Sequence, residues 1–310
     1  MTGVQTCALP ISMIHLDTKK IIITTDFSET SLLAIKHGAF LAQYTKGEVY
    51  LVHIISKHWE KFNVFTPSIS LDNIEKASTV VEEKLEELAE GIRKDYGVKV
   101  TTVVNTGNPT TEIVRFAKEI SAGLIVMGTH GYSAWEDLTI GSNALKVITK
   151  SPCPVLTMSE HADKLGYNQI IIPIDTSEHT RHKVPLIIEL AKQFTAKIFA
   201  VGLLADDEGS KKPAMTVMLN QVVTAAKEKG VMCETELLEN VKNRAIATVQ
   251  FSEKVGGDLI AIMTDQDAEI SGFFLGHYAL QVIHHSKVPV ISIKPQEHPE
   301  NISFDILAGT

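Results

Sequence analysis

The chain has 310 residues, of which 44% are hydrophobic, and its formal net charge is -8. This length corresponds to about two ordinary domains, and the apolar content is enough to build two cores. A negative field repels backbone phosphates, so the composition argues against nonspecific nucleic-acid binding.

Cysteine usage points to a reducing compartment, and the lengths of the apolar runs argue against a membrane span. The three cysteines, Cys7, Cys153 and Cys233, are too few and too widely spaced for a disulfide framework or a CxxC metal site. The longest apolar runs are strand-sized, far below the ~20 residues that cross a bilayer, and no export signal precedes them. We expect a cytoplasmic chain with no membrane partner.

The amino-terminal residues 1–12, MTGVQTCALPIS, differ in character from everything that follows. They resemble a translated adapter joined to an open reading frame, and Met13 has the position of a native start. We predict that residues 1–12 are a non-native leader and exclude them from fold reasoning.

Short apolar runs alternate with helical patterns from Lys20 onward. Before residue 160 the patterns predict strands over 21–23, 49–55, 98–104, 124–127 and 155–158, and helices over 31–43, 73–96, 110–120 and 142–149. This alternation is typical of an α/β fold in which helices cover both faces of a five-stranded, doubly wound parallel sheet. Ligands of such folds bind in a crevice at the carboxyl ends of the strands.

A glycine-containing loop connects the strand over 124–127 to the following helix. Gly128 and Gly131 allow a sharp turn and a close approach of the backbone to a ligand. Gly141 and Ser142 stand where the first unpaired amides of the helix carry a partial positive charge. The segment therefore predicts an anion site, most simply for phosphate. His130 lies inside this loop, where phosphate contact and a permissive loop position are equally open readings.

The spacing Gly-x2-Gly-x9-Gly-Ser resembles the nucleotide-binding signature of the universal stress protein family, and it matches at Gly128, Gly131, Gly141 and Ser142 without a gap. The segment Thr24-Thr25-Asp26-Phe27-Ser28 is similar to the family's ribose- and adenine-contacting first strand, and Leu51-Val52-His53-Ile54 is similar to its second. The resemblance implies an ATP site formed by Thr24, Thr25, Asp26, Ile54, Gly128, His130, Gly131, Gly141, Ser142 and Asn143.

Asp26 has two interpretations on position alone. Its carboxylate can accept hydrogen bonds from two ribose hydroxyls, or it can cap the following helix through the amides of Ser28 or Glu29. The two are equal without the resemblance, which favours the ribose.

The second part of the chain repeats the first. Residues 170–178 repeat 21–29 at an offset of 149 with six identities in nine, and 276–283 repeat 141–148 at an offset of 135 with five in eight. The difference of 14 places extra loop in the first copy, at 56–71. We predict domains over 13–159 and 167–295, joined by a short polar linker, and a tail over 296–310.

The second copy has lost most of the motif. Gly128, Gly131 and Ser142 correspond to Met263, Gln266 and His277, while Asp175 and Gly276 are retained. Side chains at the two loop positions would occupy the room a triphosphate needs. We therefore expect a degenerate second site.

The resemblance implies a cytoplasmic, nucleotide-dependent stress sensor or regulator that binds ATP, with Mg2+ as an optional companion ion. No catalytic residue is assigned, hydrolysis is expected to be slow at most, and no metal-ligand spacing such as HExxH occurs.

Family domains commonly pair through their last strands, so 155–158 and 290–293 are expected to join the halves as an intramolecular pseudo-dimer, and a homodimer is a further option. The alternatives are an adenylyl-transferring or ATP-hydrolysing enzyme of a related α/β group, whose SGGxDS or HIGH-like motif is absent, and an assembly protein without nucleotide.

Overall fold

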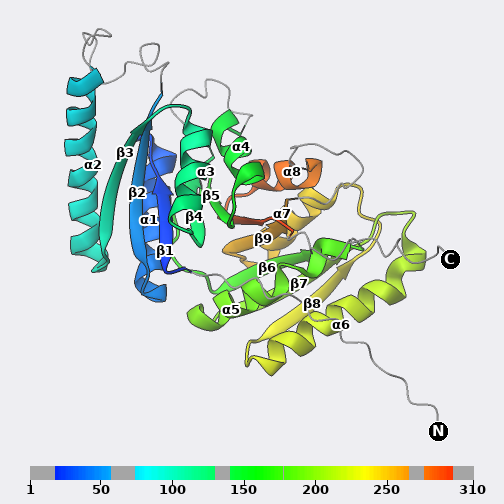
Figure 1. Ribbon diagram of the computed structural model, residues 1–310. Helices are drawn as coiled ribbons and strands as arrows, with labels where there is room; N and C mark the ends of the chain where they lie inside the picture. The colour runs from blue at the N-terminus through cyan, green and yellow to red at the C-terminus, as the bar shows by residue number, and fades with distance from the viewer. Residues whose placement is uncertain (1–17, 57–73, 130–139, 177, 265–275, 296–310) are drawn as a thin grey trace, which may run out of the picture.

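A computed structural model of the protein describes residues 18–56, 74–129, 140–176, 178–264 and 276–295 (Figure 1). The predicted leader, most of the predicted extra loop, His130, Gly131, Gln266 and the tail lie outside the described residues. The first half contains β1 (Lys20–Thr24), α1 (Glu29–Thr45), β2 (Glu48–Ile55), α2 (Ile74–Tyr96), β3 (Val100–Thr106), α3 (Pro109–Glu119), β4 (Leu124–Gly128), α4 (Ser142–Lys150) and β5 (Val155–Met158). The second half contains β6 (Gln169–Ile174), α5 (Val184–Phe194), β7 (Lys197–Leu203), α6 (Lys212–Glu228), β8 (Cys233–Leu238), α7 (Arg244–Val255), β9 (Leu259–Met263), α8 (His277–His285) and β10 (Val290–Ile293).

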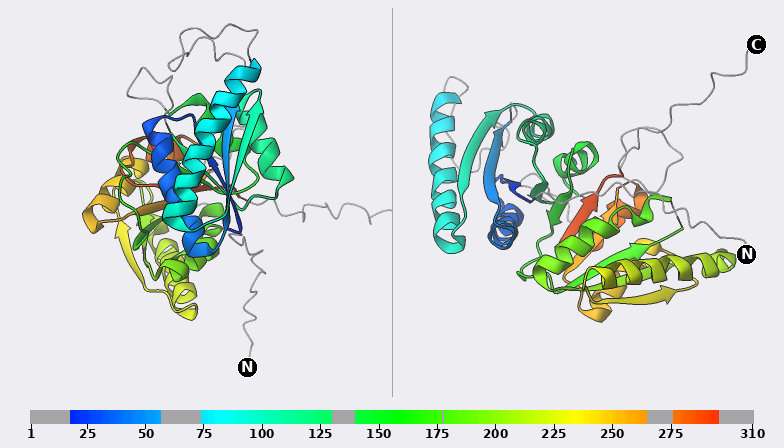
Figure 2. Two further views of the ribbon diagram at one scale, coloured as in Figure 1. Left: turned by 90° about the vertical axis from the view of Figure 1, so that its left-hand side faces the viewer. Right: turned by 60° about the horizontal axis from the view of Figure 1, so that its bottom comes forward.

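All described strands belong to one ten-stranded sheet with the order β3-β2-β1-β4-β5-β10-β9-β6-β7-β8. Within each half the neighbouring strands are parallel, and the second half repeats the order of the first. The two halves meet where β5 and β10 pair antiparallel, with Leu156 opposite Ile291. Figures 1 and 2 show α2 and α6 at opposite ends of the molecule, next to the outer strands β3 and β8. The predicted doubly wound fold and the pairing of the last strands are both confirmed.

Helices cover both faces of this sheet. The buried residues of α1, α2, α5 and α6 form one apolar cluster against one face, while those of α3, α4, α7 and α8 form a second cluster on the other face. Both clusters run through the two halves without interruption. Among the described residues no helix is both long and apolar enough to cross a membrane.

Helix starts follow two patterns. The side chains of Ser28, Asn108 and Asn243 cap α1, α3 and α7 by accepting a backbone hydrogen bond from the third residue beyond. By contrast, α4 and α8 begin after Gly141 and Gly276, which provide no side-chain cap. The asparagine cap of α3 was predicted, whereas β3 begins two residues later than the predicted strand over 98–104.

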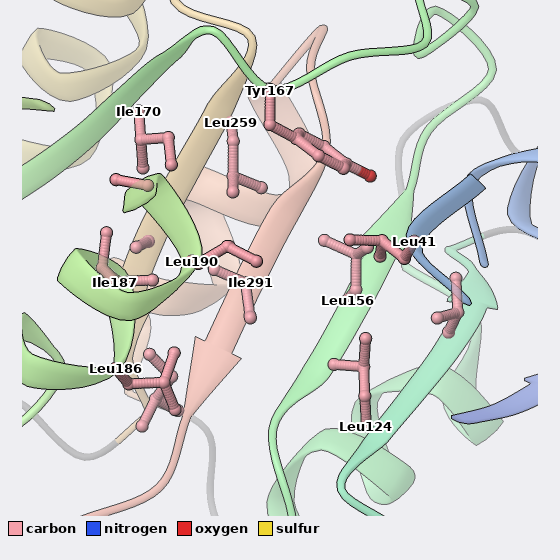
Figure 3. Packing of buried hydrophobic residues seen from close by; sticks show 14 of the residues in the cluster. Leu41, Leu124, Leu156, Tyr167, Ile170, Leu186, Ile187, Leu190, Leu259 and Ile291 are labelled. Atoms are coloured by element: carbon pink, nitrogen blue, oxygen red, sulfur yellow. The ribbon is translucent and has the colours of Figure 1, made fainter. Parts of the chain in front are cut away.

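The segment between the halves is anchored at the interface by two buried residues, while most of its other residues are exposed. Ala162 and Tyr167 are buried, and both bond to His37 of α1: His37 Nε2 lies 2.9 Å from the Ala162 carbonyl oxygen, and Nδ1 lies 2.8 Å from the Tyr167 hydroxyl. In Figure 3 the hydroxyl of Tyr167 points away from Leu259, toward the side of Leu41 and Leu156. The carbonyl can only accept, so Nε2 carries the proton and Nδ1 accepts from Tyr167.

Candidate functional site

The predicted site residues that the structure describes gather at the carboxyl ends of neighbouring parallel strands. β1 lies between β2 and β4, which is the point where the strand order reverses direction. Thr24 and Thr25 are buried at the end of β1, Asp26 is exposed directly after them, and Ile54 is half-buried near the end of β2. Gly128 ends β4, and Gly141, Ser142 and Asn143 form the start of α4. His130 and Gly131 lie outside the described residues, so the structure does not place them.

Asp26 takes part in the turn that starts α1. Its Oδ1 accepts from the Ser28 amide at 3.1 Å and from the Ser28 hydroxyl at 2.5 Å, and Ser28 in turn caps the helix. The bond to the Ser28 amide is the one that the capping interpretation expected. A carboxylate offers about four acceptor positions on two oxygens, so this turn and a ribose contact are compatible.

Three side chains beside Asp26, those of Phe27, His53 and Lys84, were given no role by the sequence analysis. His53 Nδ1–H donates to the Thr25 carbonyl oxygen at 2.8 Å, and the His53 ring stacks on Phe27 with ring centres 4.9 Å apart. The Lys84 ammonium of α2 lies 4.7 Å from the centre of the Phe27 ring. Burial lowers the pKa of His53, which the Thr25 carbonyl and Asp26 oppose. A neutral, oriented imidazole therefore fixes the backbone at the end of β1.

The positive φ of Phe27, 65°, makes this arrangement possible. A left-handed conformation is rare for an aromatic residue, and it turns the chain sharply between β1 and α1. The Phe27 amide donates to Thr25 Oγ1 at 3.0 Å, which holds the turn. No periodicity in the sequence signals a single left-handed residue of this kind.

Gly128 has a packing role that the sequence analysis did not predict. A Cβ at this position would lie 2.8 Å from Thr30 Oγ1 and 3.1 Å from the Ser31 amide nitrogen. The glycine thus lets α1 approach the end of β4, while the prediction attributed it to close approach of a ligand. The packing of α1 and the proposed approach of a ligand concern the same edge of the sheet, because α1 begins there beside the end of β4.

The start of α4 is tied to the end of β4 through the backbone. The Gly141 amide donates to the Thr129 carbonyl oxygen at 2.7 Å, and the Thr129 amide donates to Met158 of β5 at 2.9 Å. Ser142 and Asn143 are exposed, and no side chain caps the helix. The unpaired amides and the positive end of the helix dipole together favour an anion here.

Metal ligation receives no support from the described side chains. Among them, no group of three or more His, Cys, Asp or Glu residues is arranged to hold a metal ion. A divalent ion at this site would thus depend on ligand oxygens and waters for most of its coordination, which is common for Mg2+ bound with phosphates.

The equivalent edge of the second half differs in its side chains. Met263 ends β9 in the place of Gly128 and is 0% exposed, and His277 begins α8 in the place of Ser142. Asp175 follows β6 as Asp26 follows β1, but only 8% of its surface is exposed. The Asp175 amide donates to Thr180 Oγ1 at 3.1 Å.

Comparison with known proteins agrees with this architecture. The sequence model of the universal stress protein family matches twice, over residues 17–158 and 166–294. Universal stress protein MJ0531 of Methanocaldococcus jannaschii is 35% identical over 148 residues, covering 46% of this chain and 82% of the relative. Universal stress protein Rv2319c of Mycobacterium tuberculosis is 23% identical over 278 residues, covering 81% of this chain and 91% of the relative.

A solved structure has the same two-part fold. The crystal structure of a universal stress protein from Archaeoglobus fulgidus superposes with a TM-score of 0.72 at 19% identity, covering 90% of this chain and 99% of the other. At that identity the likeness concerns the fold. Together with the double match of the family model, it shows that this chain belongs to the universal stress protein family.

Proposed function

We propose that the first half binds ATP at the carboxyl ends of β1, β2 and β4, and that the chain acts as a nucleotide-dependent stress sensor or regulator in the cytoplasm. Thr24, Thr25 and Asp26 would contact the ribose and Ile54 the adenine. The loop and helix start from Gly128 to Asn143 would hold the phosphates.

One observation carries this proposal. The uncapped start of α4 and the exposed carboxylate of Asp26 flank the same switch point, between β4 and β1. The start of α4 favours an anion, and the Asp26 carboxylate favours a pair of hydroxyls. A nucleoside phosphate carries both groups on one molecule, with the ribose between base and phosphates.

The same geometry favours binding over catalysis. Ser142 could donate its hydroxyl and amide to a phosphate, but we assign no general base or nucleophile to the site. A Mg2+ ion held by the phosphates would neutralise their charge. We therefore infer that hydrolysis is slow at most and that the bound nucleotide acts as a signal.

We infer further that each chain binds one nucleotide. Phosphate binding needs amides within about 3 Å of the oxygens, and we expect the side chains that replace the two loop glycines, Met263 and Gln266, to keep the backbone away. Met263, which replaces Gly128, is fully buried at that edge. The full chain is the right sample for this test, because separating the halves would expose the edges of β5 and β10.

Two measurements test the proposal. Mass spectrometry of small molecules released from protein purified without added ligand should detect an adenine nucleotide. Isothermal titration of nucleotide-free full chain should give one ATP per chain and weaker binding of cAMP, whose 3′ oxygen is esterified and cannot donate to Asp26. Titration that detects no adenine nucleotide binding would overturn the proposal, and two equal sites would overturn the stoichiometry.

A further inference from the structure

The second half holds a carboxylate at the carboxyl ends of its parallel strands, the edge of the sheet at which the first half is proposed to bind nucleotide. Glu208 lies in the loop after β7, and only 12% of its side chain is exposed. Its Oε2 accepts from the Ala205 amide at 2.9 Å and from Arg244, and its Oε1 accepts from Lys211 at 2.9 Å. Burial raises the pKa of Glu208, but these hydrogen bonds outweigh it and lower the pKa to about 2. The group is an anion at every physiological pH.

Arg244 is the main partner of this anion. It is the first residue of α7, directly after the cap Asn243, and it stands in the position that Pro109 holds at the start of α3. Its side chain is 36% exposed, but its Nε is buried and has no hydrogen-bond partner among the described residues. A buried N–H without a partner is unfavourable, because it has lost its hydrogen bonds to water. The Arg244 guanidinium thus donates to one acceptor, Glu208, and can donate to a second through Nε.

Further charged groups surround the pair. Lys211 also contacts Thr176, which follows Asp175 at the end of β6, with 3.4 Å between Nζ and Oγ1. Lys183 is fully buried and donates to the Thr180 carbonyl oxygen at 2.6 Å. Asp175 thus interacts with Lys183, while Glu208 interacts with Lys211 and Arg244. Without Glu208, Arg244 and Lys211 would lose the carboxylate that both of them contact.

We propose that the crevice of the second half is a site for a tetrahedral oxyanion, such as sulfate or phosphate, and that the chain's own Glu208 carboxylate occupies it. The carboxylate makes the contacts that a bound oxyanion would make: one backbone amide, one ammonium and one guanidinium. The loop after β7 is thereby fastened to the start of α7. This internal anion keeps external phosphates out by charge, and this proposal does not depend on ATP binding in the first half.

Removing the charge of Glu208 tests the proposal in the full chain. Glu208→Gln keeps the shape of the side chain but leaves Arg244 and Lys211 without an anion, so the melting temperature should fall. Low millimolar sulfate should then raise it by at least about 2 °C relative to chloride of equal ionic strength, a shift typical of roughly 1 kcal/mol. Sulfate stabilises many proteins generally, so the effect is the difference between variant and wild type.

Two controls locate the effect. Glu253→Gln removes a carboxylate from an exposed pair with Lys287 in the same half and should show no sulfate-specific rise. Adding Arg244→Met to Glu208→Gln should abolish the rise, and crystals of Glu208→Gln grown in sulfate should hold the anion at Arg244. If Glu208→Gln fails to fold in chloride, its refolding yield in sulfate gives the same readout. Equal sulfate effects in wild type and Glu208→Gln, or a rise that persists without Arg244, would overturn the proposal.

Discussion

The two halves share one topology but begin their first helices differently. In the first half α1 starts at Glu29, three residues after Asp26. In the second half a 3-10 turn over Glu178–Arg181 precedes α5, which starts only at Val184, nine residues after Asp175. A Cβ on Gly128 would collide with Thr30, and Met263 fills the equivalent room in the second half. The residue that ends the neighbouring strand and the place where the helix begins thus differ together between the halves.

A second difference lies at the interface. His37 of α1 corresponds to Leu186 of α5 at the offset of 149. Both are buried, but only His37 makes polar contacts across the interface, to Ala162 and Tyr167. The halves are thus held together by a contact that is not symmetric, although the strands that pair are equivalent.

Exchanging Met263 for glycine should have the largest effect on stability. Met263→Gly restores the glycine of the first half but leaves a cavity, because α5 begins later along the chain than α1 does. We therefore expect the free energy of unfolding to fall by about 3 to 5 kcal/mol. Urea denaturation measures this loss. Met232→Gly, at a methionine that is 67% exposed, is the matched control and should cost about 1 kcal/mol or less. Similar losses for both variants would show that Met263 does not set the packing at this edge.

Blocking the glycine loop should remove ATP binding. Gly131→Val places a branched side chain where close approach of the backbone to phosphate is proposed, so at least two charge-assisted hydrogen bonds are lost and affinity should fall by more than about 100-fold. The circular dichroism spectrum should stay nearly unchanged. Gly209→Val, at the first residue of the 3-10 helix Gly209–Lys211 in the second half, has open space for its side chain and should leave affinity intact. Wild-type affinity in Gly131→Val would refute the assignment of the loop.

The two aspartates that follow β1 and β6 should differ in their effect on the ligand. Asp26→Ala should weaken ATP by about 1.5 to 3 kcal/mol, because hydrogen bonds to a charged group are lost. It should change the affinity of 2′,3′-dideoxy-ATP little, and Asp175→Ala should change neither. Isothermal titration gives all four values. Equal losses for ATP and the dideoxy analogue would assign Asp26 to the turn before α1 alone.

The smallest expected effect is a pH dependence at the interface. Burial lowers the pKa of His37, which the Ala162 carbonyl and Asp163 oppose. Its stabilising contribution is therefore fully present above the unfolded pKa of about 6.5 and is lost as pH falls through the lower folded pKa. His37→Leu copies the second half and leaves the Tyr167 hydroxyl without its acceptor, which should cost about 1 to 3 kcal/mol at pH 7.

The same variant should therefore approach wild type in stability as the solution is acidified. Urea denaturation at neutral and mildly acidic pH measures the gap between the two proteins. His37→Leu combined with Tyr167→Phe is the control, since it removes both polar partners together. A gap that stays constant or widens at low pH would contradict a neutral His37.

The fold was predictable from sequence because apolar runs and caps are local signals. The strand over 155–158 and the cap at Asn108 both follow from residues near them. The left-handed Phe27 and the reason for Gly128 were not predictable, since both depend on the start of α1 packing against β4. The contact of Lys84 with Phe27 was not predictable either. Periodicity gives the exposed face of a helix but not the distance of that face from the carboxyl ends of the strands.

The antiparallel pairing of β5 with β10 has a further consequence for how this protein can change. Two identical chains that associate by a twofold axis carry every substitution twice, so neither can lose a site that the other keeps. Here the equivalent strands belong to one chain, and the connecting segment keeps their effective concentration high at any dilution. Each half can therefore change its sequence independently of the other. The two unlike halves, with Gly128 in one and Met263 in the other, always pair one to one because a single chain carries both.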